Sequence, residues 1–343
     1  MHPFVIGFLQ TPAGPVPQVG SRPTARDRLG AILARIGPTR NNYKVTPGLY
    51  AVGSPGPESP VLVTANYKLS FDTLRFQLDS MNAWLLVADT RGINVWCAAG
   101  KGTFSTEEII YSVKQCHLQE LVSHHLLILP QLGATGVAAF QVTKKCGFKI
   151  LFGPVRAPDL PAFLKNDNRA DEAMRSVTFT LRERAVLIPV ELYLLVKPLT
   201  LFFLAGILLS GIGPSIFSAA TAWTRGLRLM SATLMGIGCG TILVPLILPW
   251  LPGRQFWVKG LLPGLAGGLT CWSISAGHIS TLENLALLLW VTVVSSYLAM
   301  NFTGATPFTS PTGVEHEMRR GIPVQSIATA IGLLLWLSSP FIS

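Results

Sequence analysis

The sequence predicts two domains of different fold class: a Rossmann-like α/β domain with a mostly parallel sheet, followed by an all-α transmembrane domain of about five helices. Two observations support this prediction. Of 44 charged residues, 27 basic and 17 acidic, 35 lie in residues 1–197 and only 9 in residues 198–343. From Val61 onward, the charged part alternates short apolar runs with amphipathic segments, as strands separated by helices do. The chain of 343 residues is long enough for both domains.

The first sixty residues have a different texture. They are rich in Pro, Gly and Arg, a composition that disfavours long regular elements. We therefore expect residues 1–60 to form an irregular N-terminal arm with one helical stretch near Ala25–Ile36. The α/β domain is expected over residues 61–168, a linker over residues 169–190 and the transmembrane domain over residues 191–343.

Within the α/β domain, each element follows from its local pattern. Ser105 and Glu108 have the spacing of a capping box, which predicts a helix from about Thr106 to Cys116. Amphipathic stretches predict two further helices, at Ser70–Ser80 and Pro158–Lys165. Short apolar runs predict the four strands Val61–Ala65, Ala83–Ala88, His125–Leu129 and Lys149–Phe152.

Five segments without Asp, Glu, Lys or Arg follow one another after residue 197. Each exceeds the roughly 20 residues that a helix needs to cross a bilayer. We expect spans near residues 192–212, 229–249, 260–278, 284–302 and 323–341. Lys and Arg gather before the first span and in the loops after the second and fourth, which predicts a cytoplasmic α/β domain and an external C-terminus. Arg225 and Arg228 fall on the opposite side, and Glu283 is expected at an interface. The prediction is a multi-pass protein of the cytoplasmic (inner) membrane.

Composition excludes several functions. The net charge of +10 fits attraction to anionic lipid, and no basic-aromatic stripe or nucleic-acid module is present. Five cysteines without paired spacing argue against a disulfide framework or a zinc site. No phosphate-binding P-loop occurs, and Gly133–Gly136 lacks the spacing of a dinucleotide fingerprint. The DxHxxG motif of histidine-ligated cobalamin proteins is also absent.

Small or hydrogen-bonding residues follow all four predicted strands. In a parallel sheet, ligands bind outside the carboxyl ends of the strands, where these segments would meet. The convergence therefore predicts a cofactor site at this edge of the sheet. The segments are Thr64–Asn66, Asp89–Cys97, Gln131–Gly136 and Gly153–Arg156.

A lone cysteine lies in the second of these segments. Asn94 can act as a helix N-cap, which puts Cys97 at the third helical position, among unpaired backbone N–H groups. Those groups and the helix dipole favour a thiolate, the form of cysteine that binds metals and attacks electrophiles. The small residues Ala98, Ala99 and Gly100 would let a flat partner approach closely. The alternative for a lone cysteine is an ordinary buried thiol.

The octapeptide Asn94-Val95-Trp96-Cys97-Ala98-Ala99-Gly100-Lys101 resembles the signature of the HgcA family, the mercury-methylating membrane corrinoid proteins. Residues 61–165 also resemble the corrinoid domain of the corrinoid iron–sulfur protein large subunit, through Val61–Tyr67, Leu132–Gly136 and Gly153–Arg156. The resemblance implies a corrinoid, cobalamin or a related molecule in the base-off form, with the Cys97 thiolate as lower axial ligand of cobalt. The cofactor-binding residues that it implies are Thr64, Asn66, Asn94, Val95, Trp96, Cys97, Ala98, Ala99, Gly100, Lys101, Leu132, Gly133, Ala134, Thr135, Gly136, Gly153, Pro154 and Arg156.

The function implied by the resemblance is methyl transfer from cobalt to Hg(II), which gives methylmercury, with Cys97 as the catalytic residue. A soft thiolate opposite a cobalt–methyl bond would favour departure of a carbanion-like methyl group or a methyl radical. The implied partners are the two-cluster ferredoxin HgcB as electron donor and a folate-linked methyl donor system. Two alternatives stay open: a membrane-tethered corrinoid protein that methylates another acceptor, and a non-enzymatic cobalamin carrier.

For several residues near this site, the sequence leaves two roles open. Lys101 either contacts the cofactor or solvates the helix end, and Arg156 pairs either with a cofactor phosphate or with an acidic partner. Cys116 and Cys146 are expected to be buried structural thiols, with a relay of Hg(II) as the alternative. The three histidines of this domain are expected at the surface or in turns: His117, His124 and His125.

Overall fold

A seven-stranded sheet forms the centre of the first of two units into which the chain divides, residues 1–177, and a set of long helices forms the second, residues 178–343. The computed structural model describes residues 2–309 and 311–342. Four of the six strand pairings in the sheet are parallel, as expected for this fold class. The order of strands is β1 (Val5–Thr11), β2 (Gly14–Val19), β3 (Gly48–Val52), β5 (Ala83–Ala88), β4 (Val61–Ala65), β6 (Leu126–Leu129) and β7 (Lys149–Phe152).

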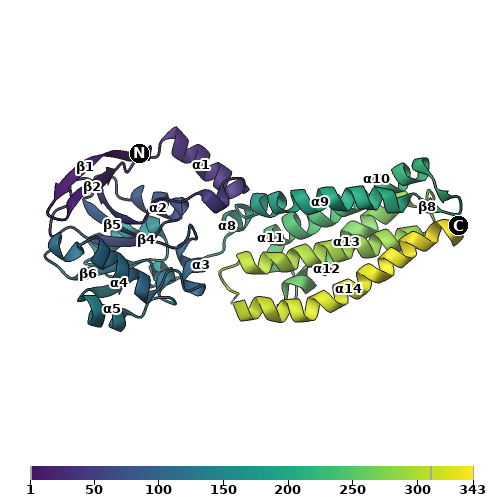
Figure 1. The fold of residues 1–343 in the computed structure, drawn as a ribbon. Coiled ribbons are helices and arrows are strands. Elements are labelled where there is room, and N and C mark those ends of the chain that lie inside the picture. Colours follow the sequence, from purple (N-terminus) through teal and green to yellow (C-terminus); the bar gives the residue numbers. More distant parts are fainter. Residues whose placement is uncertain (1, 310, 343) are drawn as a thin grey trace. The chain divides into compact units, whose positions relative to one another are not determined.

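The expectation of an irregular N-terminal arm is wrong. Residues 5–52 supply β1, β2 and β3, which extend the sheet beyond β5 (Figure 1). Only Gln18 and Val19 of β2 pair with β3, so Pro15 and Pro17 lie where the missing N–H group costs no pairing on that side. The helix α1 (Ala25–Ile36) lies at the predicted bounds and begins at a capping box formed by Thr24 and Asp27.

A buried charge cluster attaches α1 to α2 (Lys68–Arg75). Lys68 and Arg75 each approach the Asp27 carboxylate to 2.8 Å, and both also pair with Asp72. Burial alone would raise the pKa of Asp27, but hydrogen bonds from Lys68, Thr24 and Arg75 outweigh it and hold the pKa well below its usual range. The first sixty residues are thus integral to the α/β unit.

Helices cover both faces of the sheet. One face packs against α3 (Val95–Gly100), α4 (Thr106–Gln115) and α5 (Ala139–Cys146), and the other packs against α2 and α6 (Leu160–Lys165). The chain leaves β4 toward the α2 face, whereas it leaves the neighbouring strand β6 toward the α5 face. Adjacent strands whose connections diverge in this way define a topological switch point, where ligands bind in α/β folds.

The linker expected over residues 169–190 is also not a separate segment. Residues 169–177 belong to the α/β unit, because the Val155 N–H donates to the Met174 carbonyl oxygen at 2.8 Å and Met174 packs on the core around Phe163. A short helix, α7 (Glu172–Arg175), lies in this stretch. The remainder forms α8 (Leu181–Ala185) and the first turn of α9 (Ile188–Ser210), which are parts of the helical unit.

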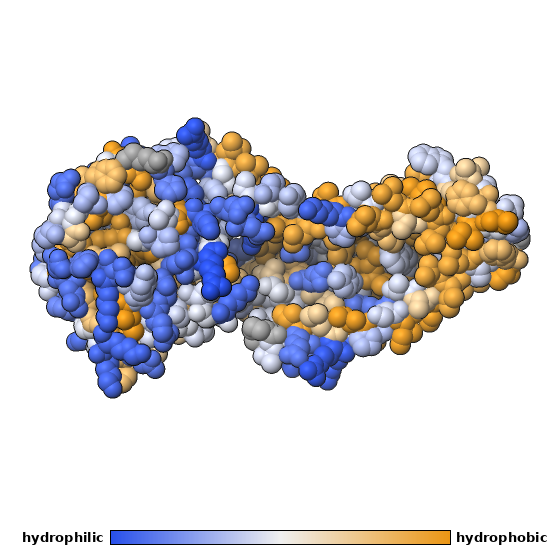
Figure 2. Space-filling view, in the orientation of Figure 1, coloured by the Kyte–Doolittle hydropathy of each residue, from blue (hydrophilic) through white to orange (hydrophobic). Residues whose placement is uncertain are grey.

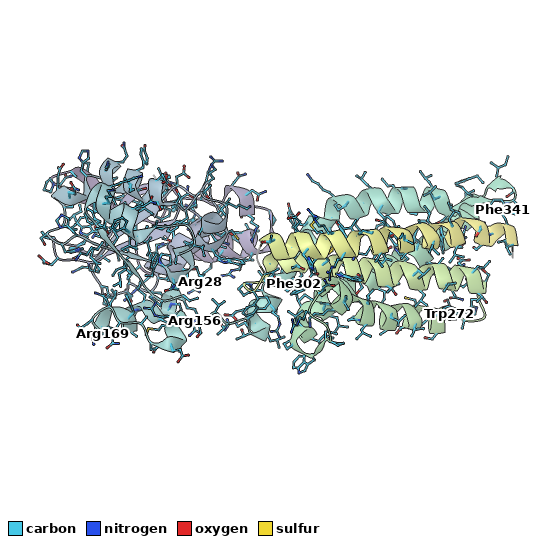
Figure 3. All side chains as sticks on the ribbon, turned by 90° about the horizontal axis from the view of Figure 1, so that it is seen from below. Arg28, Arg156, Arg169, Trp272, Phe302 and Phe341 are labelled. Carbon is cyan, nitrogen blue, oxygen red and sulfur yellow. The ribbon has the colours of Figure 1, made fainter. Side chains whose placement is uncertain are left out.

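Four helical segments among the described residues are long and apolar enough to cross a membrane. The first, Leu181–Ser210, contains α9. The second, Ala219–Trp250, contains α10 (Ala219–Ile237), the π-helical segment η5 (Gly238–Leu243) and α11 (Val244–Ile247). The third, Thr281–Ala305, contains α13 (Thr281–Asn301), and the fourth, Thr312–Ile342, lies in α14 (Pro311–Ile342). Hydrophobic residues cover much of the visible surface of this unit (Figure 2). In Figure 3, Phe302 lies at one end of the unit, and Trp272 and Phe341 lie toward the other.

The expected span near residues 260–278 forms a helix, α12 (Phe256–Ser275), but α12 is not among those four. Its sequence contains Lys259 and four glycines. The glycines have a packing role: a Cβ at Gly264 would lie 2.8 Å from the Thr292 Cα, and one at Gly260 would lie 2.7 Å from the Ser295 oxygen, both on α13. Small residues let the two helices approach closely.

Arg225 and Arg228, which oppose the expected orientation, lie at a charge cluster inside the helical unit. Arg225 is 4% exposed and donates to the carbonyl oxygens of Ser210 and Trp336, and its Nε lies 3.6 Å from the Glu283 carboxylate. Arg228 approaches the same carboxylate to 3.4 Å. Glu283 is thus buried within the helical unit, in the first turn of α13, and these charges serve helix packing.

Candidate functional site

A pocket of about 390 Å³ lies at the switch point, where β4 and β6 end. Its walls come from both strands, from α2 and α3, and from the segment after β7. Most of its lining is apolar, with a few polar groups, as is typical of small-molecule sites. Seven residues predicted from the sequence line it: Thr64, Asn94, Val95, Trp96, Leu132, Gly153 and Pro154.

The helix α2 supplies one wall that the sequence analysis missed. Leu69, Ser70, Thr73 and Leu74 line the pocket from this helix. Residues four apart lie on the same helical face, so a helix that begins a few residues after Thr64 must present one face to the same strand end. That signal was present in the sequence.

Cys97 lies in the first turn of α3, next to the pocket-lining residue Trp96. As predicted, Asn94 caps this helix: its Oδ1 accepts a hydrogen bond from the Cys97 N–H at 2.9 Å. The Cys97 side chain is partly exposed and is not part of the pocket lining. Ala98 and Ala99 are buried against the core of the α4 face, while Gly100 and Lys101 are exposed. The cap thus fixes the short turn that carries the thiol.

Asn66 supports the loop before α3 rather than lining the pocket. It is 2% exposed, and its Oδ1 accepts hydrogen bonds from the Thr90 N–H, the Thr90 hydroxyl and the Gly92 N–H at 3.1, 2.9 and 2.9 Å. Its Nδ2 donates to Asp89 at 2.9 Å. The single proton of the Thr90 hydroxyl is shared between Asn66 and the Ile93 carbonyl oxygen, which lies 2.6 Å from it. One carboxamide therefore holds the segment that leads into the cysteine helix.

A second contact fixes the start of the same loop. The Glu108 carboxylate accepts hydrogen bonds from the Asp89 N–H at 2.8 Å and from the Ser112 hydroxyl at 3.1 Å. The Ser105 side chain caps α4 as predicted, by accepting from the Glu108 N–H. Glu108 thus links α4 to the loop that Asn66 holds.

The predicted glycine segment packs beneath α3. A Cβ at Gly133 would lie 2.6 Å from the Phe104 ring, and one at Gly136 would lie 2.9 Å from the Ala99 Cα and overlap the Phe104 carbonyl oxygen. These glycines permit the close approach of residues 131–136 to the cysteine helix. Of this segment only Leu132 is also in the pocket lining, whereas Ala134 and Thr135 are not.

Arg156 is exposed and does not line the pocket. It projects from the surface of the α/β unit (Figure 3), and its Nε lies 3.1 Å from the Asp159 carboxylate. This contact is with an acidic side chain of the same chain. Whether Lys101 or Arg156 contacts a cofactor stays a prediction.

The other thiols and the histidines of this unit have structural surroundings. Burial raises the pKa of the Cys116 thiol to about 11, so it is protonated at neutral pH. Cys146 is buried, and its Sγ lies 3.2 Å from the Val142 carbonyl oxygen. His117 is exposed beside Glu120, and His124 bonds the Ser59 carbonyl oxygen. Within the described residues, no three His, Cys, Asp or Glu side chains come together as a metal site.

Part of the α/β unit matches a known family. Residues 37–163 match the family model described as CO dehydrogenase/acetyl-CoA synthase delta subunit. This region contains the pocket and α3, and it begins inside the segment expected to be an arm. It covers a little more than a third of the chain and none of the helical unit.

Individual proteins agree with this match. The chain is 31% identical over 130 residues to the acetyl-CoA decarbonylase/synthase complex subunit gamma of Archaeoglobus fulgidus, which is 37% of this chain and 27% of that protein. It is 32% identical over 130 residues to the same subunit of Methanopyrus kandleri, covering 37% and 28%. The chain thus spans about a quarter of the length of these relatives. The matches support the expected relationship to corrinoid iron–sulfur proteins and do not single out the mercury-methylating family.

Proposed function

We propose that the chain is a membrane-bound corrinoid protein that transfers a methyl group from cobalt to Hg(II), with Cys97 as the lower axial ligand. The observation that carries this proposal is the position of Cys97 on an Asn94-capped turn beside the pocket at the switch point. The relationship of residues 37–163 to subunits of acetyl-CoA complexes supports the corrinoid. The octapeptide around Cys97 supports the finer assignment to mercury methylation.

The residues present fit a flat macrocycle. A corrin ring supplies four nitrogen ligands of its own, so the protein needs to contribute one donor rather than a cluster. A single partly exposed thiol next to an apolar pocket satisfies that need. Thr64, Trp96, Leu132 and Pro154 would contact the ring or its edge, since they line the pocket.

Each part of the site has a role in the proposed reaction. When bound, the corrinoid supplies the cobalt–carbon chemistry of methyl transfer. Cys97 would hold the metal through its thiolate and donate electron density to it, and ligand identity is a main means by which proteins tune such a metal. Asn66 and Glu108 act as positioning residues, because they hold the loop that leads to Cys97. Asn94 fixes the first turn of the helix.

The family resemblance implies the proposed partners, and the chemistry of turnover calls for a source of electrons. A bound corrinoid that gave up its methyl group as a carbanion equivalent would need two electrons from a donor before it could be methylated again. The sequence contains no iron–sulfur ligand pattern, so the electrons would come from another protein. We propose the two-cluster ferredoxin HgcB for this role and a folate-linked system as methyl donor. The proposal places the α/β unit in the cytoplasm, where both would meet it.

The decisive experiment is the optical spectrum of the purified full-length protein with cobalamin. We expect the signature of base-off, sulfur-ligated cobalt, which Cys97→Ala loses and the matched control Cys116→Ala keeps. With Hg(II), a reductant and a methyl donor, the wild type should form methylmercury. Cys97→Ala should form none, and Cys97→His should keep the corrinoid but lose activity. Full methylation by Cys97→Ala would exclude the axial-thiolate mechanism.

The relatives favour one second candidate. Because they are subunits of acetyl-CoA complexes, a membrane-tethered corrinoid protein that methylates a different acceptor fits the same pocket. The same assay separates the two: a protein that binds cobalamin through Cys97 but forms no methylmercury with Hg(II), reductant and methyl donor supports the second candidate.

A further inference from the structure

An apolar groove of about 780 Å³ lies among α9, α10, α13 and α14 in the helical unit. It continues into a smaller cavity of about 250 Å³, with which it shares Phe202, Trp290, Thr329 and Leu333. The smaller cavity reaches Trp336. Gln325 and Trp336 are eleven residues apart on α14, about 17 Å at a rise of 1.5 Å per residue. That length is about half of the roughly 30 Å hydrocarbon thickness of a bilayer.

One of the residues that line this groove has a buried polar atom without a partner among the described residues. Gln325 lines the groove, is 6% exposed, and its Oε1 has no hydrogen-bond partner among the described residues. Its Nε2 donates to the Ser296 Oγ at 2.9 Å, and Ser296 itself donates to the Trp257 carbonyl oxygen. Since the single Ser296 proton is used, the amide must present its NH₂ group there, which leaves its oxygen unpaired in the wall of the groove. A buried acceptor of this kind requires a donor.

Two hydroxyl groups that line the groove already donate their protons within the protein, so they can only accept hydrogen bonds from a ligand. Thr233 donates to the Leu229 carbonyl oxygen, and Thr329 donates to the Gln325 carbonyl oxygen. Thr233 already accepts one hydrogen bond, from the Trp290 Nε1. The polar part of the groove therefore favours a ligand that donates hydrogen bonds.

Aromatic side chains indicate a flat head group. Phe202 and Trp290 stack with ring centroids 5.0 Å apart and planes 9° apart, and both line the groove together with Tyr297. The bond from Trp290 to Thr233 fixes the indole. Stacked aromatic surfaces favour a further ring, and the apolar extension toward Trp336 suits a hydrocarbon tail.

We infer that the groove binds a lipid-soluble quinol, a hydroquinone ring on an apolar tail, with one of its hydroxyl groups donating to Gln325. A hydroquinone offers two O–H donors, whereas the oxidised quinone offers only carbonyl acceptors. The groove therefore binds the reduced form more tightly. One hydrogen bond corresponds to a preference of roughly three- to ten-fold.

The test uses the full-length protein in detergent micelles and the probes decylubiquinol and decylubiquinone. Quenching of tryptophan fluorescence gives both affinities, and Trp290→Phe identifies the responding residue. We expect the quinol to bind three- to ten-fold more tightly, and Gln325→Leu to remove that preference while both forms still bind. Gln115→Leu, the same change at an exposed site of the α/β unit, should leave the preference unchanged.

A second variant keeps the test independent of the folding of Gln325→Leu. Ala330 lines the groove from an exposed position, so Ala330→Phe fills the groove without adding a tryptophan to the assay and should weaken binding of both probes at least ten-fold. Equal affinity for the two redox forms, a preference that survives Gln325→Leu, or binding that ignores Ala330→Phe overturns the inference. A groove that retains phospholipid and admits neither probe overturns it as well.

Discussion

Replacing Asn66 by alanine tests whether one carboxamide organises the cysteine loop. The substitution removes the acceptor for the Thr90 N–H, the Thr90 hydroxyl and the Gly92 N–H. Thr90 is fully buried, so water does not readily replace the lost partner. The Thr90 hydroxyl keeps the Ile93 carbonyl oxygen as its acceptor, so the main loss is that of the two N–H groups. At about 1–1.5 kcal/mol for each, the loop should be destabilised by about 2–3 kcal/mol.

Hydrogen exchange of the full-length protein, followed by mass spectrometry, measures this effect locally. Each 1.4 kcal/mol of lost opening free energy corresponds to ten-fold faster exchange, so peptides covering residues 90–97 should exchange roughly 30- to 140-fold faster in Asn66→Ala. Peptides from α5 should not change. Asn166→Ala is the matched control, because the exposed Asn166 holds only a local bond to the Arg169 carbonyl oxygen.

The alternative interpretation of Asn66 gives a different result. If Asn66 matters through direct contact with a cofactor, exchange at residues 90–97 stays unchanged without cofactor, and the difference appears only when cobalamin is added. Unchanged protection of this loop in the cofactor-free variant therefore refutes the positioning role.

Three further predictions concern stability. Gly264→Val should lower the thermal midpoint in detergent, since overpacking against Thr292 costs about 1–3 kcal/mol, whereas Gly304→Val, with open space around its Cβ, should not. Glu283→Gln leaves Arg225 buried without its charge partner and should cost about 3 kcal/mol in a denaturant titration; a loss below 0.5 kcal/mol contradicts the ion-pair assignment. The folded-state pKa of Asp27 is lowered, so its contribution is present above the unfolded value of about 4 and is lost as pH falls further. Acid unfolding of the α/β unit should therefore be less steep in Asp27→Asn.

The strands at the centre of the sheet were predictable because burial on both faces leaves a continuous apolar run. Val61–Ala65 and Ala83–Ala88 were predicted at their observed bounds, and every residue of both strands is buried. In contrast, β1 alternates between partly buried and exposed residues, and β2 contains two prolines. Such edge strands depend on pairing with distant residues, and the local pattern alone does not reveal it.

The helix caps were predictable because they join residues that are close in sequence, whereas contacts between residues far apart in sequence were not. Asn94 and Ser105 accept from N–H groups three residues away, so the spacing specifies the contact. The Glu108 carboxylate, expected to complete a capping box, instead accepts from the Asp89 N–H nineteen residues away in sequence. A contact across the sheet edge has no signature in the spacing of its two residues.

At the candidate site, the type of a residue indicates that it lies near the pocket but does not reveal what it does there. Asn66, Gly133 and Gly136 were predicted to bind the cofactor because they follow strands at the correct edge of the sheet. In the structure, the Asn66 carboxamide holds the loop before α3, and the two glycines allow residues 131–136 to pack against Phe104 and the cysteine helix. A polar or small residue at a strand end marks the neighbourhood of a site in both cases. Only the geometry distinguishes a residue that faces the pocket from one that holds the residues that do, and the exchange behaviour of the Asn66 variant measures that difference directly.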